Sequence, residues 1–103
     1  MTTAVISYRT KPEAADENQR LVENVLAELA TVSPPGLRYS VFRLADAVSF
    51  VHVVDGDGLA ELPAFQEFQR GLNDRLAAGP TRQDATLVGS YAPALAERSG
   101  VRP

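Results

Sequence analysis

The order of six regular segments along the chain limits its fold more than any other feature. Four runs rich in β-branched and aromatic residues predict strands, at residues 4–9, 37–44, 48–55 and 85–91. Two amphipathic stretches predict helices, one from Pro12 to the terminating segment Ser33-Pro34-Pro35-Gly36 and one over residues 63–77. The order strand, helix, strand, strand, helix, strand predicts an α+β fold of the ferredoxin-like βαββαβ type. In that fold, two helices cover one face of a four-stranded antiparallel sheet.

The predicted strands carry apolar side chains on both of their faces. In the third strand, Phe50, His52 and Val54 share one face, whereas Val51 and Val53 share the other. Two helices on one side of a sheet leave its other face bare, and soluble monomers rarely expose so large an apolar patch. We therefore expect a second copy of the chain to cover that face, which gives a homodimer.

Length and charge limit the possible domains and partners. The chain has 103 residues, of which 45% are hydrophobic and 22% charged, and this fits one globular domain. We assign residues 1–92 to that domain and expect the polar residues 93–103 to form a C-terminal tail. The net charge is −3 and no basic block is present, so nucleic acid is not an expected partner. No apolar run approaches the roughly 20 residues that a membrane-spanning helix needs, so no membrane association is expected.

The cysteine and histidine contents exclude several kinds of site. The sequence has no cysteine, which excludes disulfides, thiolate zinc sites and cysteine nucleophiles. This composition, together with the lack of a signal-peptide pattern at the N-terminus, predicts a cytoplasmic protein. A single histidine cannot form a histidine cluster within one chain. We therefore expect neither a metal nor another cofactor.

The single histidine, His52, is the first candidate for a catalytic role. It lies in the middle of a predicted strand, among Phe50, Val51, Val53 and Val54. One interpretation is a general base or hydrogen-bond donor inside an apolar pocket, with a pKa set by its surroundings. The other is a buried neutral imidazole that is hydrogen-bonded to a backbone or tyrosine oxygen. The sequence leaves both interpretations open.

Aromatic residues and arginines form two further groups of candidates. If several of the rings line one cavity, they would hold a flat ligand and the tyrosine hydroxyls would orient it. Arg9 and Arg43 would hold a carboxylate or a phenolate if they point into such a cavity. Otherwise the rings fill the core, and the arginines lie at strand ends and form salt bridges across a subunit boundary. The aromatic candidates are Tyr8, Tyr39, Phe42, Phe50, Phe65, Phe68 and Tyr91.

Several segments resemble the antibiotic biosynthesis monooxygenase family of dimeric α/β-barrel proteins. They are Val5-Ile-Ser-Tyr-Arg-Thr-Lys-Pro12, the hairpin Tyr39 to Val54, Leu62-Pro-Ala-Phe-Gln-Glu-Phe68 and Leu87-Val-Gly-Ser-Tyr91. The resemblance extends to about Tyr91. It implies a dimer whose two sheets face each other in a barrel, and a ligand pocket between the helices and the sheet of each subunit.

The same resemblance implies a choice of activities. Members include cofactor-independent oxygenases of polycyclic phenols and quinols, haem-degrading enzymes, and proteins with no assigned reaction. The haem degraders use a tryptophan, and they also use a histidine on the second helix. This chain has no tryptophan, and Phe68, Gln69 and Gly71 occupy that part of the helix, so haem degradation is not expected.

Two hypotheses about function remain. The first is a cofactor-independent monooxygenase of flat aromatic substrates of the phenol or quinol type. In it, His52 is the catalytic base and Tyr8, Tyr39 or Tyr91 positions the ring hydroxyl. The second is a non-catalytic or stress-related dimer of the same fold that binds a small molecule. A His52 side chain that opens into a cavity beside tyrosine hydroxyls would favour the first hypothesis.

Overall fold

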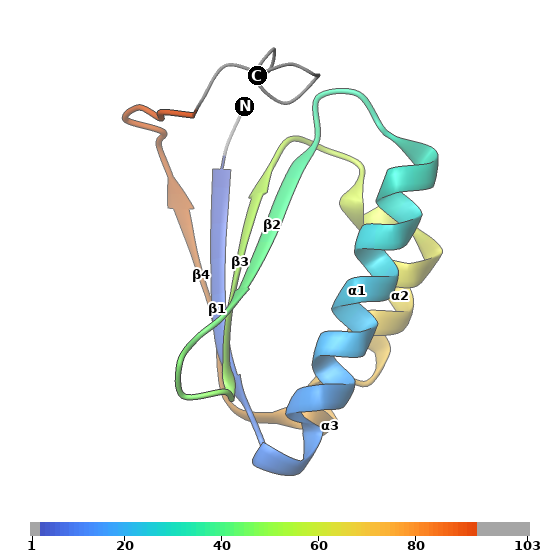
Figure 1. The fold of residues 1–103 in the computed structure, drawn as a ribbon, viewed down its shortest axis with the longest axis vertical. Coiled ribbons are helices and arrows are strands. Elements are labelled where there is room, and N and C mark those ends of the chain that lie inside the picture. Colours follow the sequence, from blue (N-terminus) through green and yellow to red (C-terminus); the bar gives the residue numbers. More distant parts are fainter. Residues whose placement is uncertain (1–2, 93–103) are drawn as a thin grey trace, which may run out of the picture.

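Residues 3–92 of the computed structural model form an antiparallel sheet with helices packed on one face (Figure 1). The strands are β1 (Thr3–Thr10), β2 (Arg38–Arg43), β3 (Ser49–Asp55) and β4 (Leu76–Ala85). The helices are α1 (Ala15–Val32), α2 (Pro63–Arg70) and α3 (Leu72–Arg75), with short 3-10 turns η1 (Pro12–Ala14) and η2 (Leu59–Glu61). The strand order is β2-β3-β1-β4, so the predicted ferredoxin-like α+β fold is confirmed. The predicted tail, 93–103, lies outside the described residues.

The pairing register decides which side chains of the sheet face the helices. Strand β3 pairs with β1 and with β2, and His52 stands opposite Ile6 on one side and Val41 on the other. Phe50, His52 and Val54 therefore share the helix-covered face with Tyr8. The sequence alone left open which face of the third strand the helices cover. No helix in the described part of the chain is long and apolar enough to cross a membrane.

Helix α1 supplies most of the layer that covers this face. Its buried stripe includes Leu21, Val22 and Val25, whose spacing puts them on one side of the helix. The proline at the start of η1 begins the helical segment, and Ser33 ends it in a left-handed backbone conformation (φ 50°). The predicted first helix is thus confirmed at both of its ends.

The last strand begins earlier than predicted. Strand β4 spans Leu76–Ala85 instead of residues 85–91, and the helical segment before it breaks at Gly71 and ends at Arg75. The strand passes through Gly79, whose φ is 92° and where an added Cβ would lie 3.0 Å from the Ser7 carbonyl oxygen. The pairing register of β4 with β1 shifts at this point, and an edge strand tolerates proline at such an irregularity.

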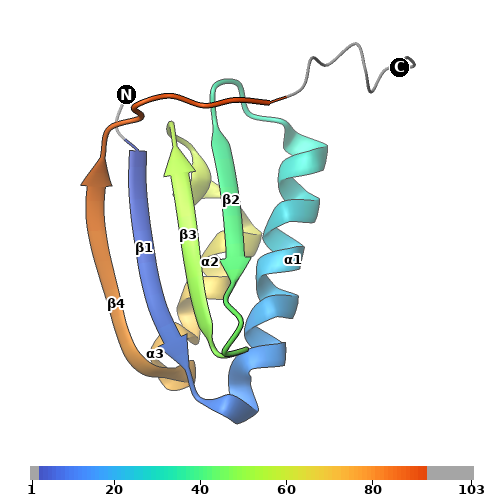
Figure 2. The same ribbon diagram turned by 60° about the vertical axis from the view of Figure 1, so that its left-hand side comes forward.

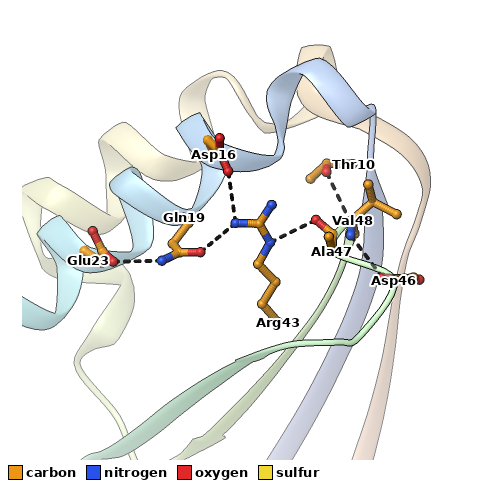
Figure 3. A network of polar contacts seen from close by, with 8 residues as sticks. All are labelled: Thr10, Asp16, Gln19, Glu23, Arg43, Asp46, Ala47 and Val48. Carbon is orange, nitrogen blue, oxygen red and sulfur yellow. Dashed lines mark hydrogen bonds and ion pairs between the residues drawn. The ribbon is translucent and has the colours of Figure 1, made fainter.

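Arg43 connects the turn between β2 and β3 to helix α1 (Figure 3). Its guanidinium donates hydrogen bonds to Asp16 Oδ1 at 3.1 Å, to Gln19 Oε1 at 2.7 Å and to the Ala47 carbonyl at 2.9 Å. It also lies over the Phe50 ring, at 5.6 Å from the ring centre. Arg43 is therefore engaged in holding the hairpin against the helix, and it does not line a cavity.

The opposite face of the sheet carries apolar side chains that no element within residues 3–92 covers. Val5, Val51 and Val53 are half-buried there, and Phe42 is 55% exposed. Figure 2 shows the helices gathered on the other side of the strands. This arrangement agrees with the two-faced apolar pattern of the sequence.

Candidate functional site

A cavity of about 680 Å³ lies between the sheet and the segment formed by η2 and α2. Such a volume is within the usual range of small-molecule sites. Apolar and aromatic side chains form most of its wall. The polar lining residues are Tyr8, Tyr39, His52 and Arg82 on the sheet, Asp57 in the loop after β3 and Gln69 on α2. Lining residues include Ile6, Tyr8, Tyr39, His52 and Val54 from the sheet and Leu59, Phe65, Phe68 and Leu72 from the helical side.

His52 stands between two tyrosine hydroxyls in the sheet wall of this cavity. Tyr8 on β1 and Tyr39 on β2 are diagonal neighbours of His52 on the same face, a separation that aromatic side chains can bridge. The Tyr8 hydroxyl lies 2.7 Å from His52 Nε2, and the Tyr39 hydroxyl lies 2.7 Å from Nδ1. Both ring nitrogens are therefore hydrogen-bonded within the protein.

The hydrogen bonds continue from Tyr8 into the core. Asn18 Nδ2 donates to the Tyr8 hydroxyl at 2.8 Å, and Arg75 Nε donates to Asn18 Oδ1 at 2.9 Å. Asn18 is fully buried and Arg75 is only 6% exposed. The five side chains Arg75, Asn18, Tyr8, His52 and Tyr39 thus form one connected series, called the buried chain below.

Burial sets the protonation state of three groups in the cavity wall, His52, Tyr8 and Tyr39. Desolvation lowers the pKa of His52 from its ordinary 6.5 to about 4. It raises the pKa of Tyr8 to about 12, although the hydrogen bond from Asn18 and the charge of Arg75 act in the opposite direction. Desolvation also raises the pKa of Tyr39. At pH 7 the imidazole and both phenols are therefore neutral.

Arg75 brings a positive charge into the core beside this site. Its guanidinium donates a second hydrogen bond to the Phe68 carbonyl at 2.7 Å and lies 5.2 Å from the centre of the Phe68 ring. No carboxylate among residues 3–92 lies within 4 Å of it. Burial lowers its pKa, but from so high an ordinary value that the group remains charged. Amide and carbonyl dipoles, rather than an ion pair, compensate the buried cation.

The structure brings together five of the eight site residues expected from the sequence. Tyr8, Tyr39, His52, Phe65 and Phe68 all line the cavity. The His52 ring centre lies 5.2 Å from that of Tyr8 and 5.5 Å from that of Phe68. These contacts place the expected histidine and the expected aromatic side chains around one space.

The other three expected residues do not line this cavity. Arg9 and Phe42 lie on the opposite face of the sheet, because they alternate with helix-facing neighbours on β1 and β2. Arg9 borders a shallow hollow on that face. Tyr91 follows the end of β4 and is 93% exposed. These three residues have no part in the site described here.

Asn18 and Arg75 belong to the site, although neither was expected from the sequence. Asn18 precedes Leu21, Val22 and Val25 by three, four and seven positions, so it continues their buried stripe. Arg75 is seven positions after the buried Phe68. A polar residue in register with an apolar stripe was therefore the available signal. Within residues 3–92, no group of three histidine, cysteine, aspartate or glutamate side chains could hold a metal ion.

Solved structures share this fold. A structure named antibiotic biosynthesis monooxygenase superposes with a TM-score of 0.70 at 18% identity, over 86% of this chain and 100% of its own. A Nitrosomonas europaea protein for which the same name is proposed gives 0.71 at 12% identity, over 84% of this chain and 89% of its own. A Mycobacterium tuberculosis protein gives 0.69 at 16% identity, over 89% and 100%. No protein-family model and no curated protein matches the sequence.

The structural likeness confirms the resemblance expected from the sequence at the level of the fold. At identities of 12% to 18%, this likeness shows the fold and assigns no role to any residue. The chemistry of this chain has to be argued from the cavity and the buried chain themselves.

Proposed function

We propose that this protein is a cofactor-independent monooxygenase of flat aromatic substrates of the phenol or quinol type. The observation that carries the proposal is a neutral histidine, held between two tyrosine hydroxyls, in the wall of a largely apolar cavity. The names of proteins with the same fold point to the same class of reaction. A cavity of about 680 Å³ accommodates a fused two- or three-ring compound.

The reaction needs no metal or flavin if the substrate itself is electron-rich. An anthrone illustrates the balance of atoms: its ring methylene loses two hydrogens, and one oxygen atom of O2 becomes the new carbonyl. The other oxygen atom leaves with the two hydrogens as water. The substrate anion passes electrons directly to O2, so the protein contributes orientation, stabilisation of that anion and exclusion of water.

His52 acts on the substrate through Tyr39 in this proposal. The imidazole is 4% exposed and both of its nitrogens are bound to tyrosines, whereas Tyr39, the last member of the buried chain, is half-buried and lines the cavity. A substrate oxygen beside Tyr39 exchanges a hydrogen bond with that hydroxyl. Of the two roles considered for His52, base and hydrogen-bond donor, these contacts favour the donor role, exerted through Tyr39.

We expect Tyr39→Phe to lower turnover of an anthrone about 10²-fold, because it removes the hydroxyl beside the substrate oxygen and little volume. The assay measures O2 consumption and the incorporation of one atom of ¹⁸O2 into the product. Tyr91→Phe is the matched control, since it removes the hydroxyl of an exposed tyrosine that is not among the residues lining the cavity. Wild-type protein that consumes no O2 with anthrones or quinols would contradict the proposed reaction.

A second function is supported by the same contacts. Because both nitrogens of His52 are hydrogen-bonded to tyrosines, the imidazole also fits a purely structural role in a non-catalytic, ligand-binding protein. Such a protein would bind a flat aromatic compound with one oxygen near Tyr39 and release it unchanged. Tight binding without O2 consumption would favour this function over the monooxygenase.

We further propose that the protein is a homodimer whose uncovered sheet faces pack together. Val5, Val51, Val53 and Phe42 would then leave water, and at about 25 cal/mol for each Å² this burial favours association. Light scattering at micromolar concentration should give about twice the 11.1 kDa of one chain. Val53→Asp should abolish this mass and, because obligate dimers depend on their interface, lower the unfolding temperature as well. A stable wild-type monomer would contradict the barrel.

A further inference from the structure

We propose that Arg75 and Asn18 are positioning residues that fix the direction of the buried chain, so that Tyr39 donates its O–H into the cavity. The cavity then favours a ligand with an oxygen that accepts a hydrogen bond, such as a carbonyl or a phenolate, over a ligand with no acceptor. The choice of ligand deepens the proposed function and rests on it. The direction of the hydrogen bonds in the buried chain does not rest on the proposed function, because it follows from the protein alone.

The inner end of the buried chain contains only donors directed toward Tyr8. A guanidinium has no acceptor atom, so the Asn18 oxygen has to face Arg75, at 2.9 Å from Nε. The Asn18 amide group therefore faces the Tyr8 hydroxyl, at 2.8 Å, and donates to it. This contact fixes the Tyr8 oxygen as an acceptor toward its inner neighbour.

The Tyr8 proton then has one remaining partner. Among residues 3–92, the Tyr8 hydroxyl has two polar neighbours, Asn18 and His52. Since Asn18 is the donor in the first contact, the Tyr8 proton finds an acceptor within the described residues only if it is donated to His52 Nε2. The reverse arrangement, in which Nε2–H donates to Tyr8, would leave a hydroxyl proton of a 5% exposed residue without an acceptor.

The outer half of the chain follows from the neutral state of the imidazole. A neutral imidazole that accepts at Nε2 carries its single proton on Nδ1. Nδ1–H therefore donates to the Tyr39 oxygen across the 2.7 Å contact. The Tyr39 oxygen is then occupied as an acceptor on that side, and its own O–H is free for a ligand in the cavity.

The first test is the tautomer of His52, which nitrogen NMR reads directly. The chain contains one histidine, so the imidazole signals of uniformly labelled protein need no further assignment. We expect the Nδ1–H tautomer at pH 7, with no ligand added. Observation of the Nε2–H tautomer in the wild-type protein would overturn the proposal, whatever the protein does with substrates.

The second test reverses the chain with Asn18→Asp, a change of nearly equal size. The carboxylate would pair with Arg75 and accept the Tyr8 proton. In the wild-type protein Asn18 does not accept this proton, because its NH2 group faces Tyr8. The Tyr8 oxygen would then accept from Nε2–H, and Nδ1 would accept from the Tyr39 O–H. We expect the tautomer to switch to Nε2–H in this variant. An unchanged tautomer in folded Asn18→Asp would show that residue 18 does not set the direction, and if the variant does not fold, the wild-type tautomer decides.

The third test asks whether the direction determines the ligand. The probes are 1,4-naphthoquinone, whose oxygens only accept hydrogen bonds, and naphthalene, which has no oxygen. We expect the wild-type protein to bind the quinone at least tenfold more tightly than naphthalene and Asn18→Asp to lose most of that preference. Equal affinity of the wild-type protein for both probes would overturn the assigned ligand class. Binding of neither probe would contradict the proposed function, while the tautomer would still decide the direction.

Discussion

His52→Gln is expected to lower the oxidation of an anthrone or a quinol by at least about 10²-fold, in a protein that remains folded. Glutamine keeps a polar group of similar reach beside Tyr8. It does not carry a ring with one nitrogen toward each tyrosine. The contact between the two halves of the buried chain is therefore lost, and Tyr39 is no longer oriented toward the substrate oxygen.

The experiment compares single-turnover oxidation and thermal unfolding of the same two preparations. A purely structural role for His52 predicts the opposite pattern: unchanged oxidation of the aromatic compound, and a loss of about 1–3 kcal/mol in the free energy of unfolding from a disturbed buried hydrogen bond. A folded variant that retains full turnover would remove His52 from the mechanism. Tyr39 and Tyr8 would then be the groups to examine next.

The protein should lose stability as the pH falls from about 6.5 to about 4. The pKa of His52 is about 4 in the folded state, against 6.5 for an unperturbed histidine, so the unfolded chain binds a proton more readily in this interval. The contribution of the neutral imidazole is complete above pH 6.5 and is lost as the pH falls through 4. A difference of this size corresponds to roughly 3 kcal/mol of unfolding free energy.

The measurement is denaturant unfolding at fixed protein concentration between pH 7 and pH 4. His52→Gln is the reference protein, because its pH dependence contains every carboxylate and lacks the imidazole. That reference matters, since hydrogen bonds from Ser49 and Val48 lower the pKa of Asp46, and acid would destabilise both proteins through that group. If the wild-type protein loses no more stability than the variant, His52 is not held neutral by burial.

The fold was accessible from the sequence because its signals are local. Proline at the start of the first helix, the proline-rich segment after it and the β-branched and aromatic content of the first three strands each specify a nearby conformation. The two parities of the third strand also predicted correctly that His52, Phe50 and Val54 share a face. Which of the two faces the helices would cover depends on pairing between distant strands, and no local signal contains it.

The last strand was misplaced for a reason specific to Gly79 and Pro80. In isolation this dipeptide is typical of a helix end or a turn, and the prediction placed a helix before it and the strand well after it. In the structure, both residues lie inside β4, where an irregular pairing with β1 accommodates them. Leu87 and Val88, which suggested the strand, are instead exposed beyond its end.

The candidate site was predictable in its aromatic half and not in its charged half. Tyr8, Tyr39 and His52 were named from their residue types, and the pairing register of the strands puts the three on one face. Asn18 and Arg75 are 57 positions apart and meet only because α1 and the end of α3 pack together. A polar residue on an apolar stripe predicts a buried hydrogen-bond partner, but sequence spacing does not identify that partner.

The two walls of the cavity differ in how freely their side chains can be substituted. The sheet wall holds His52 and its tyrosines in a hydrogen-bonded series in which each member depends on the next. The helical wall presents Phe65 and Leu72, which are hydrocarbon side chains without a hydrogen-bonding group. A substitution at Phe65 or Leu72 therefore changes the shape of the cavity without breaking a hydrogen bond of the sheet wall.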